Sequence, residues 1–374
     1  MAKNIVICCD GTGNQYSDKN TNVIKLYSAL DLSDNTQQIA YYHPGLGTIG
    51  AASALTRLAK WWTKVKGLAF GYGLTADIGD AYKFLMDYYE DGDRVYLYGF
   101  SRGAYTVRAL SGMLHMLGLI RKGDDALVPY ATDMLKRSQA DAAGMADKFK
   151  ATFSRECKPY FVGVWDTVSS VGWAYDPLHI PYTANNPDIS FGRHAISIDE
   201  RRSFFRQNLW SADQPGNIKQ VWFAGVHSDI GGGYVETESA LAKITLEWML
   251  IEAKAAGLRV VGSRVDEVLG LNGSGSRPDA NAMMHDSLGE GWWWLLEILP
   301  HRHWDSTTKS YHWKIPLGRR RSIKDGAHLH ESVALRKDYK PSNLPKNPGT
   351  QEPWVRWSKS TGGASIATGS AAPG

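Results

Sequence analysis

A serine flanked by two glycines is the residue of this chain best suited to chemistry. Residues 99–103 read GFSRG, which matches the pattern G-x-S-x-G with Ser101 at its centre. A short apolar run at 94–98 precedes the pattern, and helical spacing of apolar residues over 103–117 follows it. A nucleophile elbow needs this order of strand, sharp turn and helix. An ordinary glycine-rich turn is the alternative, but it does not require that context. We therefore predict that Ser101 is a nucleophile.

A serine hydroxyl becomes a good nucleophile only beside a base that a third group orients. Asp166 directly follows the apolar run 160–165, and His227 follows the run 219–224. Functional side chains gather at the carboxyl ends of parallel strands, so both residues are expected at the sheet edge that carries Ser101. The order serine, acid, histidine is that of α/β-hydrolases. The sequence therefore predicts a catalytic triad of Ser101, Asp166 and His227.

Other acids and histidines are alternatives for the two partners. His194 could pair with Asp199, and Asp199 and Asp229 are alternative acids. Asp229 precedes a run of three glycines, so support of that loop is its more natural role. His43 also follows an apolar run, but it comes before the serine and breaks the chain order. Six further histidines fall in a region expected to be cap or surface: His285, His301, His303, His312, His328 and His330.

Acyl transfer also needs two backbone N–H groups around the oxygen on which negative charge develops. The amide of Arg102, directly after Ser101, is the first expected donor. The second is expected from Gly11 or Thr12, because the glycines of the loop DGTGN let the backbone approach a substrate closely. Asp10, the first residue of that loop, is expected to support the site. The loop fits neither of the two common phosphate-binding glycine patterns.

The elements around these residues predict an α/β fold. Apolar runs lie at 4–9, 38–42, 94–98, 160–165 and 219–224, and helical spacing lies at 76–89, 103–117 and 239–256. Such alternation is typical of a mostly parallel sheet flanked by helices, and with the elbow it predicts an α/β-hydrolase fold. We expect one domain over residues 1–345, cap or lid insertions at about 50–75 and 257–325, and a flexible tail at 346–374.

The composition excludes several classes of protein. The 374 residues are 43% hydrophobic and 21% charged, which is enough to build a large core. The net charge of +4 is too weak to indicate a nucleic-acid partner, and the basic run Arg319, Arg320 and Arg321 is interpreted as a solvated loop. Three cysteines form no disulfide framework. No cluster has the spacing of metal ligands, so neither a metal nor another cofactor is expected.

The sequence shows no secretory signal and no apolar stretch of the roughly 18 residues that would span a bilayer. We expect a cytoplasmic protein, with export by a signal-independent secretion system as the alternative. Two segments could touch lipid: residues 55–66 combine a Trp-bearing apolar face with basic residues, and residues 292–296 read WWWLL. Packing of both segments on the core as cap helices is the alternative interpretation.

Several motifs in one order resemble a known family. They are DGTGN at 10–14, GFSRGAYTVR at 99–108, VWDTV at 164–168 and GVHSDIGGGY at 225–234. Together they resemble the catalytic domain of type VI secretion lipase effectors of the G-x-S-x-G phospholipase class, within a wider group of α/β-hydrolases. The likeness extends over roughly residues 4–330. Where that family often has an acidic residue before Pro-Gly, this chain has His43.

The resemblance implies the triad Ser101, Asp166 and His227 and the hydrolysis of carboxylic esters, with phospholipid as the leading substrate. Peripheral contact with a membrane and an unidentified immunity or secretion partner are further expectations, and no nucleic-acid partner is expected. A soluble carboxylesterase, thioesterase or peptidase is an alternative, because the fold does not fix the substrate. A non-catalytic adaptor is an alternative of another class, but it would not need the serine, the acid and the base together.

Overall fold

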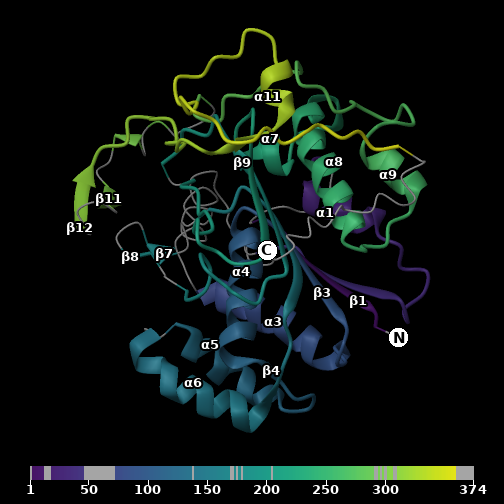
Figure 1. Cartoon of the computed structure of the whole chain (residues 1–374), viewed down its shortest axis with the longest axis vertical. Coiled ribbons are helices and arrows are strands. Elements are labelled where there is room, and N and C mark those ends of the chain that lie inside the picture. The colour runs from purple at the N-terminus through teal and green to yellow at the C-terminus, as the bar shows by residue number, and fades with distance from the viewer. Residues whose placement is uncertain are drawn as a thin grey trace, which may run out of the picture.

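The apolar runs of the sequence become the strands of one central parallel sheet in this computed structural model (Figure 1). The structure describes residues 2–11, 18–45, 72–136, 139–168, 172–173, 176–177, 180–203, 205–289, 294, 297–298, 301–305 and 310–358. The seven strands are β1 (Asn4–Cys9), β2 (Gln38–His43), β3 (Arg94–Phe100), β6 (Pro159–Trp165), β9 (Phe191–Ser197), β10 (Asn217–Phe223) and β13 (His328–Leu329). Their order across the sheet is β13-β10-β9-β6-β3-β1-β2.

Helices cover both faces of the sheet. They are α1 (Asn22–Ala29), α3 (Tyr72–Tyr88), α4 (Arg102–Leu117), α5 (Val128–Leu135), α6 (Gln139–Phe153), α8 (Ala240–Ala255) and α9 (Gly262–Val268). Successive residues of a strand point to opposite faces. Ile5 and Ile7 of β1 accordingly pack into the layer of α3 to α6, whereas Val6 and Cys8 pack into the layer of α1, α8 and α9. Burial of each such aliphatic side chain stabilises the folded state by about 1.5–3 kcal/mol relative to leaving it exposed. The two layers lie on opposite sides of the sheet in Figure 1.

The strand order places a topological switch point of the sheet beside the candidate nucleophile. β1 lies between β2 and β3, so the chain leaves β1 toward one side of the sheet and later returns to its other side. Loops diverge at such a switch point, and ligands bind there, outside the carboxyl ends of the strands. Cys9 of β1 pairs with Gly99 of β3. The loop that starts at Asp10 and the turn at Ser101 therefore leave the sheet side by side.

Strand β9 separates the strands that carry the predicted acid and base. The sequence shows residues 194–199 as a strand-like segment, but it does not show that this segment lies between β6 and β10. β9 pairs with both neighbours in parallel, with Ala195 opposite Trp165 on one side and Val221 on the other. The backbone of β9 is therefore placed to contact Asp166, the residue that follows β6.

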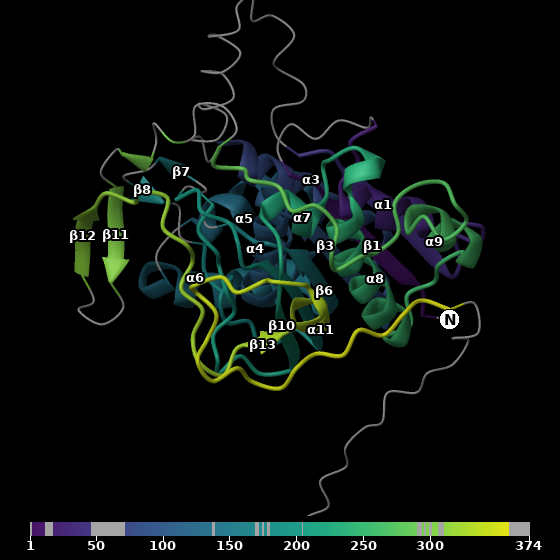
Figure 2. The same cartoon turned by 90° about the horizontal axis from the view of Figure 1, so that it is seen from above.

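The expected cap regions are only partly described. Most of the first, residues 50–71, lies outside the described residues. In the second, α9 packs against α1, while β11 (His301–Asp305) and β12 (Ser310–Lys314) form an antiparallel hairpin. The hairpin lies at the opposite side of the molecule from α9 in both views (Figure 2). Within the described ranges, no helix is both long and apolar enough to span a bilayer.

Residues 346–358 are held against the body of the protein, although the composition places them in a flexible tail. The backbone of Glu352 bonds with Leu329 of β13 and with Glu331, the first residue of α11 (Glu331–Leu335). The N–H of Trp357 donates to Glu247 of α8 at 2.8 Å, and the Trp357 side chain is 7% exposed. Residues 359–374 lie outside the described residues.

Replacement of Trp357 tests this packing. We expect Trp357→Ala to lower the free energy of unfolding by about 3 kcal/mol, because it removes a large buried ring. Val355, in the same segment, is 50% exposed, so Val355→Ala should change that free energy by about 0.5 kcal/mol or less. Urea denaturation followed by circular dichroism measures both. Equal, small effects of the two substitutions would show that the segment does not pack.

Candidate active site

Ser101 lies in the sharp turn between β3 and α4. Its backbone has φ 59° and ψ −118°, a strained conformation that costs a non-glycine residue on the order of 1–3 kcal/mol. A Cβ atom on Gly99 would lie 2.4 Å from the carbonyl oxygen of Gly103, and a Cβ atom on Gly103 would lie 2.1 Å from that of Cys9. Both distances are far below van der Waals contact. The turn therefore needs both glycines of the G-x-S-x-G pattern.

The backbone N–H of Arg102 is placed for the expected oxyanion hole. Arg102 is the first residue of α4, where amides have no acceptor within the helix and the dipole favours negative charge. The amide of Gly11, the second expected donor, already donates to Asp10 Oδ1 at 2.7 Å. Thr12 lies outside the described residues. Arg102 is thus the one predicted donor that the described structure places beside Ser101.

The Asp166 carboxylate contacts the His227 imidazole at the carboxyl edge of the sheet. Asp166 follows β6, His227 begins α7 (His227–Gly231), and the distance from Asp166 Oδ2 to His227 Nδ1 is 2.5 Å. The backbone of Asp166 also has a positive φ, 38°. Its N–H donates to the carbonyl of Ala195 on β9, and the N–H of Ser197 donates to its Oδ1 at 3.0 Å. Strand β9 therefore fixes the direction of the carboxylate.

The His227 ring contacts two aromatic rings. The ring of Phe100 has its centroid 4.6 Å from that of the imidazole, and the ring of Phe205 lies at 4.7 Å. The backbone N–H of His227 donates to Glu200 Oε2 at 3.1 Å. Burial disfavours the imidazolium and lowers the pKa of His227, although the hydrogen bond with Asp166 acts in the opposite direction. This setting favours a neutral imidazole with an orienting bond at Nδ1, as a general base requires.

Arg321 binds both oxygens of the Asp166 carboxylate, which the sequence did not predict. The distances are 2.5 Å from Nη1 to Oδ1 and 3.0 Å from Nη2 to Oδ2. The interpretation of residues 319–321 as a solvated loop is wrong for Arg321, which is 7% exposed. Burial alone would raise the pKa of Asp166, but the charge of Arg321 and the bond with His227 outweigh it and hold the pKa below its usual range. The carboxylate is therefore ionised although it is fully buried.

The Ser101 hydroxyl and the His227 ring share this edge without a hydrogen bond between them in the described structure. Phe100, which contacts the imidazole, is the residue directly before Ser101. The carbonyl of Ser101 accepts from Val168 N, two residues after Asp166, at 3.5 Å. Catalytic hydrogen bonds are often long before substrate binds and shorten in the Michaelis complex. The described contacts therefore join Asp166 to His227, with Ser101 at the same edge of the sheet.

The alternative acids and histidines have other partners. Asp229 contacts His285 Nδ1 at 2.7 Å and accepts from the N–H of Val226, so it braces the loop that carries the candidate base. Asp199 accepts from Arg320 and does not pair with His194. The carboxylate of Asp199 also accepts from Gly225 N and from the Tyr339 hydroxyl.

His194 and His43 do not pair with Asp166 or His227 in the described structure. His194 Nε2 accepts from the N–H of Thr167 at 3.1 Å, and burial lowers its pKa to about 3. His43 lies 3.5 Å from Asp77 of α3. Asp10 accepts from the hydroxyls of Thr21 and Tyr42, so it ties together the chain on either side of the loop.

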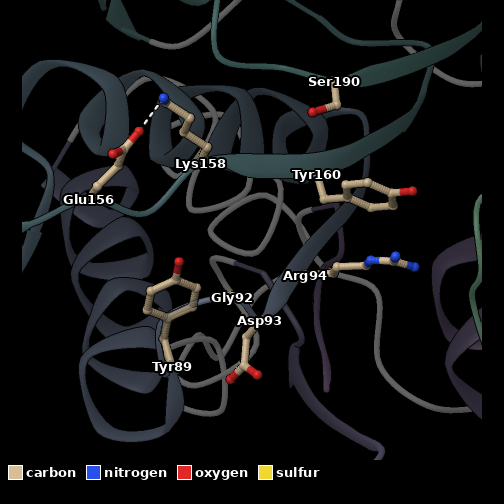
Figure 3. Close-up of a pocket in the computed structure, with 8 residues that line it drawn as sticks. All are labelled: Tyr89, Gly92, Asp93, Arg94, Glu156, Lys158, Tyr160 and Ser190. Carbon is tan, nitrogen blue, oxygen red and sulfur yellow. Dashed lines mark ion pairs between the residues drawn. The ribbon is translucent and has the colours of Figure 1, made fainter. Parts of the chain in front are cut away.

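A cavity of about 340 Å³ lies at the other edge of the sheet (Figure 3). It is lined by Tyr89, Gly92, Asp93, Arg94, Glu156, Lys158, Tyr160 and Ser190. Arg94 and Tyr160 stand at the amino ends of β3 and β6, whereas Ser101 follows the carboxyl end of β3. Glu156 pairs with Lys158 and Asp93 with Lys3, and the Arg94 guanidinium lies over the Tyr160 ring at 4.9 Å from its centroid. This cavity is therefore separate from the Asp166–His227 pair and from Ser101.

Sequence patterns give little indication of Arg321, Phe205 and Glu200, which the sequence did not predict at the site. Arg321 belongs to a basic run of the kind that usually lies in solvent, and only the fold shows that a buried carboxylate faces it. Phe205 and Glu200 lie in a loop without periodicity. Among the described residues, no group of three or more His, Cys, Asp or Glu side chains is arranged to hold a metal ion.

Comparison with known proteins adds a family match. The model of the family "T6SS, Phospholipase effector Tle1-like, catalytic domain" matches residues 3–252. A Saccharomyces cerevisiae protein, Uncharacterized protein YEL023C, is 38% identical over 220 residues, which are 55% of this chain and 32% of the yeast protein. The chain therefore spans about a third of the length of that relative.

Two solved structures are also similar. A crystal structure of an uncharacterised Pseudomonas aeruginosa protein gives a TM-score of 0.44 at 19% identity and covers 74% of this chain and 49% of that one. The structure of the Tle1 effector bound to the VgrG spike from the type 6 secretion system gives 0.35 at 19% identity and covers 64% and 52%. The chain spans about half the length of each.

Replacement of Gly103 tests the close packing at the elbow. We expect Gly103→Ala to destabilise the protein by about 1–3 kcal/mol or more, because a methyl group has no space against the backbone of β1. Gly144, also inside a helix, has nothing within 4 Å of a Cβ position, so Gly144→Ala should stabilise by roughly 0.5–1 kcal/mol. Thermal and urea unfolding measure the two effects, which should have opposite signs. A stable Gly103→Ala variant would contradict the geometry of the turn.

Proposed function

The chain belongs to the family of Tle1-like phospholipase effector catalytic domains, and from this premise we propose that Ser101, Asp166 and His227 form a triad that hydrolyses carboxylic esters of lipids. Family membership makes the protein a lipase- or phospholipase-type hydrolase. The observation that carries the finer proposal is the buried, ionised Asp166 on His227 Nδ1, beside a serine in an elbow. No other described Asp–His pair lies at this elbow.

The proposed reaction has two halves. His227 Nε2 takes the proton of the Ser101 hydroxyl as Oγ attacks the ester carbonyl carbon, and Asp166 stabilises the imidazolium that forms. The oxyanion of the tetrahedral intermediate accepts from the Arg102 N–H at the start of α4. When the intermediate collapses, His227 returns the proton to the departing alcohol and an acyl-serine remains. Water, deprotonated by His227, then releases the carboxylic acid and restores the serine.

A lipid substrate is also supported by an apolar surface next to the β11–β12 hairpin. Trp313 near the end of β12 and Ile315 and Leu317 just after it are 58%, 48% and 61% exposed. Trp294 is 52% exposed and is the one residue of the predicted segment 292–296 within the described structure. Exposed Trp and aliphatic side chains are what peripheral proteins insert at a lipid surface. The other predicted lipid segment, 55–66, lies outside the described residues.

Family membership also bears on partners and delivery. The matching family is described by its likeness to a phospholipase effector of the type VI secretion system, so we propose export by that route and binding of a delivery or immunity protein. Lipid ester is the proposed substrate class, and a water-soluble ester is the alternative that the assays below distinguish.

The triad is tested by replacing its members one at a time. Ser101→Ala should abolish labelling by a fluorophosphonate and turnover of p-nitrophenyl esters and phosphatidylcholine. Asp166→Asn should lower kcat/KM by roughly 10³- to 10⁴-fold, because the wrong tautomer of His227 is then favoured. Asp229→Asn is the matched control, since this carboxylate also contacts a histidine but not His227. Its kcat/KM should stay within about tenfold of wild type.

Three outcomes would contradict the proposal. One is a wild-type protein that the fluorophosphonate does not label, and another is equal ester turnover by Ser101→Ala. The third is a larger loss for Asp229→Asn than for Asp166→Asn, which would move the acid to the other pair. Circular dichroism of every variant checks that it is folded. A preference for soluble short esters over long-chain lipid would favour the plain esterase.

The lipid surface is tested at Leu317. We expect Leu317→Ser to weaken binding to phosphatidylcholine–phosphatidylglycerol vesicles by about tenfold, the effect of losing one buried aliphatic side chain. Turnover of a soluble ester should not change. Leu335→Ser is the matched control, because Leu335 is 52% exposed on α11, a different element. Sedimentation with vesicles measures binding, and equal binding by both variants would exclude this surface.

A further inference from the structure

We propose that Arg321 is a positioning residue of the triad, which keeps Asp166 ionised and His227 neutral so that His227 can act as the base. This inference rests on the proposed function, because it assigns a role within that reaction. Arg321 lies outside the family match at residues 3–252, and it touches no reacting atom. Its side chain is instead 5% exposed against a carboxylate that is 0% exposed.

The Asp166 carboxylate has four donors, and Arg321 supplies two of them. Oδ1 accepts from Arg321 Nη1 and from Ser197 N, and Oδ2 accepts from Arg321 Nη2 and from His227 Nδ1. The planar fork of a guanidinium holds a carboxylate in a fixed plane, which a single point charge does not do. The plane of the carboxylate determines where Oδ2 meets the imidazole. The geometry of the Asp166–His227 bond therefore depends on Arg321.

The position of Arg321 is itself determined by contacts on both sides. Arg321 Nη1 also donates to the carbonyl of Ser197, and Nη2 donates to that of Phe205. The carbonyl of Arg321 accepts from Asn343 Nδ2 at 3.1 Å. Three residues earlier, the N–H of Gly318 donates to Glu297 Oε2. A guanidinium fixed in this way cannot turn toward solvent without breaking several hydrogen bonds.

The charges around His227 are balanced while the imidazole is neutral. The charged groups that face the ring or its acid are Asp166, Glu200, Arg202 and Arg321, two anions and two cations. Arg202 pairs with Glu200 as Arg321 pairs with Asp166. His194, the other titratable group near Asp166, is buried and its pKa is lowered. The set is neutral while His227 carries no charge, so protonation of His227 adds a net positive charge to a buried site.

Without Arg321, Asp166 and His227 would balance their charge by sharing one proton. The buried pair would take up that proton at a higher pH than in the wild type, whichever of the two groups holds it. A protonated pair cannot accept the proton of Ser101. With Arg321 in place, His227 therefore stays neutral, and able to act as a base, down to a lower pH.

The pH profile of kcat/KM for a soluble p-nitrophenyl ester tests this role, because its acid limb reports the protonation of the base in the free enzyme. For Arg321→Gln we expect kcat/KM at pH 7 to fall roughly 10- to 100-fold. The acid limb should move up by about one pH unit, the direction given by removal of a cation. Arg321→Lys restores the charge without the fork, so its acid limb should return toward that of the wild type while kcat stays reduced.

Arg320→Gln is the matched control. Arg320 is the adjacent residue and also pairs with a buried carboxylate, that of Asp199, but it does not contact the triad. This variant should keep the wild-type acid limb even if it loses stability. Thermal unfolding is measured for all variants. If Arg321→Gln does not fold, Arg321→Lys provides the test instead. A wild-type kcat in Arg321→Lys would overturn the role of the two-pronged guanidinium contact with Asp166.

The proposed function and the proposed role of Arg321 are contradicted by different outcomes. If wild type is not labelled by a fluorophosphonate, or Ser101→Ala remains active, the proposed function fails. If wild type is active, Ser101→Ala is inactive and Arg321→Gln shows the same rate and acid limb as Arg320→Gln, the function stands and the role of Arg321 is overturned.

Discussion

A carboxylate without solvent contact is the constraint on which the candidate site depends. The Asp166 side chain is 0% exposed, and an ionised group in such a position is tolerated only when charge and hydrogen bonds compensate for the lost water. The compensation comes from three separate parts of the chain: β9 supplies an N–H, α7 supplies an imidazole and residue 321 supplies a cation. The same contacts that stabilise the charge also direct the carboxylate toward His227.

The sheet makes these contacts compatible with a nucleophile at the same edge. β3 and β6 are neighbours, so the elbow after β3 and the acid after β6 leave the sheet side by side. β9 separates β6 from β10, and the loop after β10 must therefore pass over the end of β9 to bring His227 to Asp166. Backbone strain at Ser101 and Asp166 is concentrated at the same edge. Such strain persists only where the surrounding structure determines the backbone fully.

The sequence predicted the parts of the site that follow from local pattern. The G-x-S-x-G turn lies between a strand and a helix that both have clear periodicity. Asp166 and His227 each follow an apolar run, so the ends of the predicted strands were enough to expect these two residues near each other. The position of β9 could not be predicted in this way, because strand order depends on pairing between distant segments. Gly11 could not be assessed from the sequence for another reason. A glycine indicates a flexible backbone, but the sequence does not show that the amide of Gly11 already donates to Asp10. The flexible tail predicted at 346–374 rests on its Ser- and Gly-rich end, whereas Trp357, a residue type that seldom stays exposed, is buried.

The distance along the chain between the groups that meet at Asp166 has a consequence for folding. His227 lies 61 residues beyond Asp166, and Arg321 lies 155 residues beyond it. Contacts between distant residues form late, because long loops must be closed before the contacts can stabilise them. During synthesis Ser101, Asp166 and His227 leave the ribosome well before Arg321 does. The Asp166 carboxylate therefore lacks two of its four hydrogen-bond donors until Arg321 has been synthesised and has folded against it.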